Sequence, residues 1–402
     1  MDKREQFGFS VVKRLDGHFG RAGMIRTPHG EIETPAFIPV GTQATLKALT
    51  PEQLKATGAQ AVLANAYHLY LRPGHELIDQ AGGLGKFMNW DGPTFTDSGG
   101  FQVMSLGVGF KKVVDMTGDV DMPLTKKDKL AWVDDDGVTF KSHLDGSQHR
   151  FTAEKSMQIQ HGLGADIIFA FDELTTLHHP YEYQIESLDR RTHPWALRSL
   201  AEHKRLTKLR SDKPYQALFG VVQGANYEDL RRKCARFLAE QDFDGFGLGG
   251  ALTKENIGEI VSWMSEELPE DKPRHMLGIS EPDDIFACIE NGADTFDCVS
   301  PARVGRNGAL YTPTGRINIT NSRFKAAFQP IDDTCDCYTC QNYTAAYLHH
   351  LFKAGEMLAS TLATIHNERF IVKLVQNIRE SILDNTYQDF KSSWLSQYYS
   401  KQ

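Results

Sequence analysis

Several apolar stretches of the sequence end in side chains that can exchange protons or bind a polar ligand. The residues at these ends are Asp97, Asp172-Glu173, Gln223-Gly224, Gly249-Gly250, Gly278 and Asp297. One aspartate in such a place is usually a helix cap or a loop anchor. Acidic groups at three ends, together with an amide and with glycines that let a ligand approach the backbone, predict instead a site for a planar polar molecule.

The stretch from 294 to 308 holds the most informative of these ends. A short apolar strand carries Asp297 and then breaks into a proline loop that holds Arg303 and Arg306. A carboxylate in buried surroundings is costly unless it is paired or used, so Asp297 is either a structural anchor or a functional group. Asp97 favours the second interpretation, because Ser98 and two glycines follow it and leave its carboxylate unshielded.

A cluster of cysteines near the C-terminus predicts a metal site. Cys335, Cys337 and Cys340 lie on one tight turn, and three thiolates need a fourth ligand to close a tetrahedral structural zinc site. The candidate fourth ligands downstream are His349, His350 and His366. The remaining cysteines, at 234, 288 and 298, are scattered, which is typical of buried apolar filling rather than of a disulfide framework.

Short strands that alternate with helical segments position the chemical residues. The predicted strands are 36–41, 61–66, 94–97, 166–172, 216–223, 246–250, 275–279 and 295–299. Continuous apolar strands of this kind are buried on both faces, as in parallel sheets. Helix starts lie between them, for example at Thr50-Pro51-Glu52-Gln53. Eight strand–helix units predict an α/β fold, a (β/α)8 TIM barrel, whose chemistry gathers at the C-terminal ends of the strands.

Three regions depart from this alternation. An N-terminal antiparallel β lead-in is expected over residues 7–34, and a β-rich insertion is expected near 103–150. The third region begins at about residue 303 and holds the cysteine cluster and a long helical tail. We therefore predict a catalytic barrel at 1–302, an inserted zinc-binding subdomain at 303–370, and a C-terminal helix at 371–402 that packs back on the barrel.

Composition limits the class of protein. The chain has 402 residues, 41% of them hydrophobic and 24% charged, with a net charge of −8. A polar first segment and the lack of a long apolar run predict no signal peptide, no membrane contact and a cytoplasmic location. The negative charge argues against nucleic-acid binding by bulk electrostatics, but a local basic face remains possible. Its candidates are Arg303, Arg306, Arg323 and Lys325, which otherwise form a solvated surface.

The run at 245–250 matches the dinucleotide-binding pattern G-x-G-x-x-G by letter. That motif requires a strand before the glycines and a helix after them. Here the glycines lie within the predicted strand itself, so we reject nicotinamide or flavin dinucleotide binding.

Ordered motifs run from about residue 7 to residue 390. They are Thr96-Asp97-Ser98-Gly99-Gly100-Phe101-Gln102-Val103, Phe171-Asp172-Glu173, Val222-Gln223-Gly224, Gly249-Gly250, Pro282-Asp283-Asp284-Ile285, Phe296-Asp297-Cys298-Val299, Gly305-Arg306-Asn307-Gly308 and His366-Asn367, besides the cysteine cluster. With these motifs the chain resembles the bacterial type of tRNA-guanine transglycosylases, the queuine tRNA-ribosyltransferases.

The resemblance implies a pentosyltransferase that exchanges the wobble guanine of tRNAs with GUN anticodons for a 7-deazaguanine base, in queuosine biosynthesis. It implies that Asp297 is the nucleophile on the ribose and that Asp97 is the general acid and base. Asp172 would accept from N1–H and the 2-amino group of the base, while Gln223 and the Gly250 amide would donate to its O6. The remaining implied contacts to the base are Ser98, Phe101, Gly249 and Gly278.

The resemblance also implies a zinc ion, one per chain and structural, held by Cys335, Cys337, Cys340 and His366. His366 lies 26 positions after Cys340, which is the family spacing. Arg303 and Arg306 would contact RNA phosphates. Family members are typically homodimers, and the zinc module helps to form their interface.

Two departures leave the incoming base open between 7-aminomethyl-7-deazaguanine and queuine. Leu174 stands where bacterial members commonly carry cysteine, and the loop 251–255 reads ALTKE instead of LAVGE or LSGGE. Two further hypotheses remain: a non-catalytic paralogue that binds tRNA as a partner subunit, and a glycoside hydrolase barrel with two carboxylates. The presence of Asp97 and Asp297 together argues against the first, and the cysteine cluster argues against the second.

Overall fold

The computed structural model describes residues 3–108 and 131–400 and has eight parallel strands at its centre. The strands are β4 (Ala36–Pro39), β5 (Val62–Ala64), β6 (Thr94–Thr96), β10 (Ile167–Phe169), β11 (Ala217–Val222), β12 (Gly245–Leu248), β13 (Arg274–Met276) and β14 (Thr295–Cys298). Around the sheet their order is β4-β14-β13-β12-β11-β10-β6-β5. A parallel bridge from Val40 to Leu63 joins the two ends, which closes the barrel. The predicted (β/α)8 fold is confirmed.

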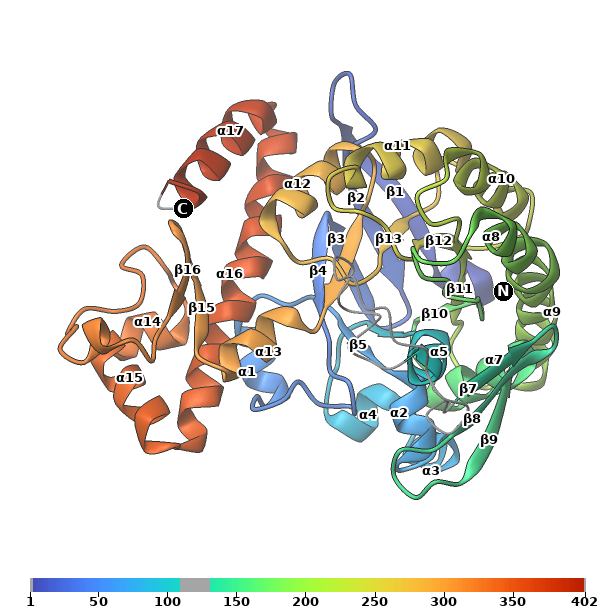
Figure 1. Cartoon of the computed structure of the whole chain (residues 1–402), viewed down its shortest axis with the longest axis horizontal. Coiled ribbons are helices and arrows are strands. Elements are labelled where there is room, and N and C mark those ends of the chain that lie inside the picture. The colour runs from blue at the N-terminus through green and yellow to red at the C-terminus, as the bar shows by residue number, and fades with distance from the viewer. Residues whose placement is uncertain (1–2, 109–130, 401–402) are drawn as a thin grey trace.

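Helices surround this barrel (Figure 1). They are α1 (Pro51–Ala56), α2 (Ala66–Leu71), α3 (His75–Gln80), α4 (Leu84–Met88), α5 (Gly100–Val108), α7 (Ala153–Leu163), α8 (Tyr181–Ser187), the π-helix η2 (Leu188–Thr192), α9 (His193–Leu209), α10 (Glu228–Ala239), α11 (Ile257–Glu267), α12 (Pro282–Glu290) and α13 (Ser300–Arg306). The start of α1 follows the sequence prediction. Thr50 accepts from the Gln53 backbone N–H, and the Gln53 side chain accepts from the Thr50 N–H, which forms a capping box.

Successive residues along each strand face opposite sides of the sheet. Phe296 belongs to the large apolar cluster between the strands and the helices. Ile38 belongs to the cluster that fills the barrel, and it lies in register with Asp297 on the neighbouring strand. Asp297 therefore lies on the inner face of the sheet, at the C-terminal end of β14.

The N-terminal antiparallel sheet expected from the sequence is present, and it covers the N-terminal end of the barrel. Its strands are β1 (Gly8–Arg14), β2 (Arg21–Thr27) and β3 (Gly30–Thr34). Phe7 and Phe9 pack against the apolar cluster inside the barrel. The ring of Phe7 meets that of Phe219 edge-on, with 6.1 Å between centroids.

The insertion between β6 and α7, which was predicted to be β-rich, begins with a helix and continues with strands. Helix α5 occupies the first residues of the expected insertion, and residues 109–130 lie outside the described part of the chain. Strands β7 (Ala131–Asp134), β8 (Gly137–Lys141) and β9 (Gln148–Thr152) then form an antiparallel sheet in that order.

The C-terminal region packs beside the barrel. It consists of β15 (Ala309–Thr312), β16 (Gly315–Asn318), the 3-10 helix η3 (Ser322–Phe324), α14 (Tyr338–Asn342), α15 (Ala345–Ala354), α16 (Met357–Leu383) and α17 (Tyr387–Tyr398). Helix α16 stands between the barrel and the hairpin β15–β16 (Figure 1), and it contacts β4, β2 and α13. It runs without a break through residue 370, so the backbone shows no boundary there. Among the residues described, no helix combines the length and apolar character needed to cross a bilayer.

A buried ion pair ties the N-terminal sheet to the barrel. Arg21 on β2 donates to both carboxylate oxygens of Asp294, at 2.9 and 2.8 Å, and the two side chains are 1% and 0% exposed. Asp294 also accepts from the Arg274 backbone N–H at 2.7 Å. Because Asp294 lies just before β14, this pair helps to set where the strand of Asp297 begins.

We expect Arg21→Met to lower the free energy of unfolding by about 3–5 kcal/mol, because it leaves the Asp294 charge buried without its partner. Urea denaturation followed by circular dichroism measures this loss. Arg14→Met is the matched control, since Arg14 pairs with Glu270 on the open surface and should leave the midpoint unchanged. Equal midpoints for the two variants would contradict the prediction.

Candidate active site and metal centre

Asp297 lies at the mouth of the barrel with one carboxylate oxygen held in place. Its Oδ1 accepts from His275 Nε2 and from the Gly278 backbone N–H, each at 3.1 Å. Gly278 has a φ of +78°, a conformation that favours glycine. Within the described part of the chain Oδ2 makes no hydrogen bond, and the side chain is 14% exposed. The second oxygen is thus available to a ligand.

Asp97 follows β6 and lies in the same mouth. Its carboxylate accepts from the Ala66 backbone N–H at 2.7 Å and from the side chains of Asn65 and Gln102. Burial raises the pKa of Asp97 to about 6 against the effect of these hydrogen bonds, and the charge of Asp297 raises it further. Asp97 can therefore take up and release a proton near neutral pH.

Asp172 forms a polar group with two of the other predicted residues. Ser98 Oγ donates to its Oδ1 at 3.3 Å, and Gln223 Nε2 donates to its Oδ2 at 2.6 Å. Burial raises the pKa of Asp172 to about 6. The Oε1 atom of Gln223 is buried and has no hydrogen-bond partner among the described residues. The group offers hydrogen-bond donors and acceptors to a ligand.

Glycine is required beside this group. Gly250 has a φ of +90°, and a Cβ there would lie 2.6 Å from Gln223 Oε1. A Cβ on Gly249 would lie 2.8 Å from Val221. A side chain at either position would therefore collide with neighbouring strands, and the predicted approach of a ligand to this backbone stays a prediction. Phe101, in the first turn of α5, is 39% exposed.

Three polar residues that touch this site were missed from the sequence. Asn65 holds Asp97, and His275 holds Asp297. Arg231 is buried without a carboxylate partner among the described residues and donates to the carbonyl of Gly249 at 2.5 Å. A polar residue inside or directly after a strand was the available signal for Asn65 and His275, whereas nothing in the sequence marks Arg231.

The loop 251–255 is anchored at two points. The Thr253 N–H donates to Asn226 Oδ1 at 3.0 Å, and Lys254 Nζ lies 3.4 Å from Asp284 Oδ2. Leu174, the other departure noted in the sequence, donates its N–H to the sulfur of Met104 at 3.2 Å.

The predicted basic residues lie on two different elements. Arg303 and Arg306 are on α13, directly after the strand of Asp297, with Arg303 exposed and Arg306 half-buried. Burial and the neighbouring charge of Arg303 lower the pKa of Arg306. Arg323 and Lys325 are exposed at η3.

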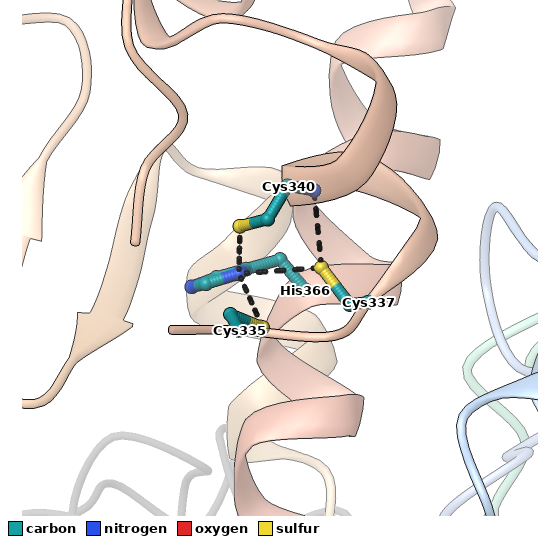
Figure 2. A group of neighbouring side chains, drawn as sticks. All are labelled: Cys335, Cys337, Cys340 and His366. Atoms are coloured by element: carbon teal, nitrogen blue, oxygen red, sulfur yellow. Dashed lines mark hydrogen bonds between the residues drawn. The ribbon is translucent and has the colours of Figure 1, made fainter. Parts of the chain in front are cut away.

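The cysteine cluster and one histidine converge on a single point (Figure 2). Cys337 caps α14, Cys340 lies within α14, and His366 comes from the middle of α16. From His366 Nδ1 the sulfurs of Cys335, Cys337 and Cys340 lie at 3.8, 3.6 and 3.3 Å. All four donor atoms lie within 4.8 Å of one another. Such a set can hold a metal ion.

The geometry of this cluster fits zinc. Tetrahedral ligands at about 2.3 Å for sulfur and 2.1 Å for nitrogen stand roughly 3.5–3.8 Å apart, close to the separations seen here. The other ring nitrogen of His366 lies 2.7 Å from the Tyr311 carbonyl oxygen, which orients the ring as is usual for a metal ligand. His349 instead hydrogen-bonds Ile319, and His350 is exposed, so His366 is the fourth ligand candidate that the structure supports.

The molecule is thus a (β/α)8 barrel with an acidic mouth and a Cys3His cluster that could hold a metal ion. The model of the queuine tRNA-ribosyltransferase family matches residues 16–400. The chain is 46% identical to the queuine tRNA-ribosyltransferase of Thermoanaerobacter pseudethanolicus, over 97% of both chains. It is 48% identical to that of Herpetosiphon aurantiacus, over 96% of this chain and 92% of the relative. It is 47% identical to a putative queuine tRNA-ribosyltransferase of Archaeoglobus fulgidus, over 93% of this chain and 96% of the relative.

The chain belongs to the queuine tRNA-ribosyltransferase family. It is therefore an enzyme of the glycosyltransferase class, and the resemblance seen in the sequence is confirmed.

We expect Cys340→Ala to lose the metal ion and to lower the melting temperature, because three donors no longer close a tetrahedral site. Atomic emission spectroscopy of the purified chain gives the metal content, and calorimetry gives the melting temperature. Cys288→Ala is the control, since Cys288 is a buried cysteine outside the cluster. The same metal content in both variants would rule out this site.

Proposed function

We propose that the chain exchanges the wobble guanine of tRNAs with GUN anticodons for a 7-deazaguanine base, as a step of queuosine biosynthesis. One observation carries the proposal. Asp297 lies beside Asp97, whose pKa of about 6 suits an acid and base, and its Oδ2 has no hydrogen-bond partner among the residues that the structure describes. Base exchange at a ribose needs this pair, a nucleophile and a proton carrier.

In the first half-reaction, Asp297 Oδ2 attacks C1′ of the ribose. The bond from C1′ to N9 of guanine breaks, and the departing base takes its proton from the carboxyl group of Asp97. The ribose is then held as an ester of Asp297, which preserves the energy of the glycosidic bond without ATP.

In the second half-reaction, the incoming base loses its N9 proton to the carboxylate of Asp97. Its N9 bonds to C1′, the bond from C1′ to Asp297 breaks, and the electron pair returns to the carboxylate. Both aspartates end in their starting state, so the cycle balances.

The polar group around Asp172 suits a guanine-like base. Asp172 accepts from N1–H and the 2-amino group of the base. The Gly250 N–H and the Gln223 side-chain amide donate to its O6. In the free chain the Gln223 amide donates to Asp172 instead. Phe101 is exposed and offers its ring for stacking. The remaining contacts to the base are Ser98, Gly249 and Gly278.

The RNA partner is proposed to contact the basic residues next to the mouth. The chain carries a net charge of −8, so attraction for phosphates must be local. Arg303 is exposed and forms no ion pair within the described residues, and it follows the strand of Asp297 directly. A wobble base in an anticodon loop is already single-stranded, which lowers the cost of turning it into a pocket.

The incoming base is either 7-aminomethyl-7-deazaguanine or queuine, the second of which would make the chain a salvage enzyme. The loop 251–255 is proposed to border the 7-substituent. Competition of the two bases in one exchange assay decides between them by the ratio of the modified nucleosides in the product tRNA.

We propose that the metal is zinc, one per chain, and that its role is structural. Four protein ligands leave no open position for a substrate, so the ion would supply cross-linking rather than chemistry. Exposed apolar side chains on the same region support a homodimer through it, namely Phe328, Tyr338, Tyr347 and Met357. The described cysteines form no disulfide, which agrees with a cytoplasmic enzyme.

We expect Asp297→Ala to abolish the incorporation of labelled guanine into unmodified tRNA with a GUN anticodon. The native chain should also form a covalent RNA adduct, seen on a denaturing gel, that the variant cannot form. Asp91→Ala, at an exposed aspartate, is the control and should keep native activity. Incorporation by Asp297→Ala would refute the mechanism, and a native chain without adduct would favour the non-catalytic paralogue.

The pKa of Asp97 predicts opposite pH profiles for the two half-reactions. Donation to guanine needs the protonated carboxyl, so the single-turnover rate of adduct formation should fall roughly tenfold per pH unit above about pH 6. The return of the proton needs the ionised form, so reaction of the adduct with guanine should slow towards acid pH. Its midpoint should lie below that of adduct formation, because the ester removes the Asp297 charge that helps to raise the pKa of Asp97. Asp97→Asn cannot titrate, and its residual rates should lack both slopes. The same slopes in that variant would contradict the assignment.

A further inference from the structure

His275 is a buried histidine that connects the nucleophile to the barrel wall. It lies on β13, is 0% exposed, and its ring packs between those of Phe95 and Phe169, at 5.4 and 5.3 Å between centroids. Nδ1 lies 2.8 Å from Thr295 Oγ1, and Nε2 lies 3.1 Å from Asp297 Oδ1. Both ring nitrogens are thus engaged, and the ring is buried away from bulk solvent.

These contacts determine which nitrogen carries the proton in the neutral ring. An ionised Asp297 can only accept, so Nε2 must donate to it. Nδ1 then accepts, and the Thr295 hydroxyl is its donor, because this hydroxyl has no other hydrogen bond within the described residues. Thr295 therefore selects the tautomer that presents an N–H to the nucleophile.

We infer that His275, together with Thr295, is a positioning residue for Asp297 that acts chiefly when the covalent intermediate is released. The inference rests on the proposed function. His275 does not touch the substrate in this role, since it contacts the oxygen that stays out of the new bond.

The reason is the change of charge on Asp297. The carboxylate carries a full negative charge before attack and after release, but as an ester it is neutral. A donor on Oδ1 stabilises the charged form more than the ester, because a hydrogen bond to an ionised acceptor is the stronger one. The His275 N–H therefore favours departure of Asp297 from C1′, and it also holds Oδ2 towards the ribose.

The two half-reactions can be measured separately. The adduct is formed first from labelled tRNA, guanine is then added in excess, and the rate of disappearance of the adduct is followed on denaturing gels. His275→Phe removes the donor and keeps a flat ring. His275→Gln keeps an N–H near the position of Nε2, and Thr295→Val leaves the imidazole without its partner on Nδ1.

We expect His275→Phe to release the adduct roughly ten- to a hundredfold more slowly than the native chain, which is the range for a hydrogen bond to a charged group. Adduct formation should slow less, so the variant accumulates adduct during turnover. His275→Gln should release it at close to the native rate, and Thr295→Val should lie between. Melting temperatures measured alongside identify a variant that fails to fold.

Three outcomes would overturn the inference. In the first, His275→Phe slows both half-reactions equally and leaves the fraction of enzyme held as adduct unchanged. In the second, His275→Gln releases the adduct as slowly as His275→Phe does. Either result would make His275 a structural residue only. In the third, the native chain itself forms no adduct, which refutes the proposed function as well. Because the native chain serves as the reference, failure of the inference alone is distinguishable from failure of the mechanism.

Discussion

The closed ring of parallel strands is the constraint on which the site depends. β4 pairs with β14 on one side, and Val40 bridges Leu63 on the other, so all eight strands point their C-terminal ends to one mouth. Asp97, Asp172 and Asp297 come from distant parts of the chain and share that mouth. Their shared field is visible in the pKa of Asp97, which Asp297 helps to raise.

Burial weakens the acidity of two carboxyl groups at this mouth. It raises the pKa values of Asp97 and Asp172 to about 6, because desolvation disfavours the charged form. Each of the two groups is therefore half protonated near pH 6, whereas a carboxylate in water would be ionised there. Arg303, the exposed arginine of α13, places a positive charge next to the mouth rather than inside it.

The Cys3His cluster is linked to the mouth of the barrel through α16. His366 belongs to the cluster, and its neighbour Asn367 donates to the carbonyl oxygens of Pro301 and Ala309, each at 3.0 Å. Asn367 also accepts from the Tyr311 N–H at 3.1 Å. Neighbouring residues of α16 thus join the Cys3His cluster to α13, the helix that follows the strand of Asp297. A metal ion bound at the cluster would therefore brace that helix.

Local patterns in the sequence were enough to predict the eight strands, the residues at their ends and the three cysteines. Continuous apolar runs, strand-end chemistry and close spacing are properties of neighbouring residues, so they can be read without a fold. The helix at 100–108 was missed, since a β-rich interpretation of the insertion extended too far towards Asp97.

Tertiary structure decided whatever depends on contacts between distant segments. The residues alone left three histidines open as the fourth ligand, and packing of α16 against α14 brings His366 to the sulfurs. The pairing of Gln223 with Asp172 and the tautomer of His275 likewise arise across neighbouring strands of the barrel. The raised pKa of Asp97 needs burial, which no single stretch of sequence contains. The sequence by itself determined which aspartates stand at the strand ends, and the closed barrel decided how readily Asp97 and Asp172 take up a proton, because their burial raises both pKa values.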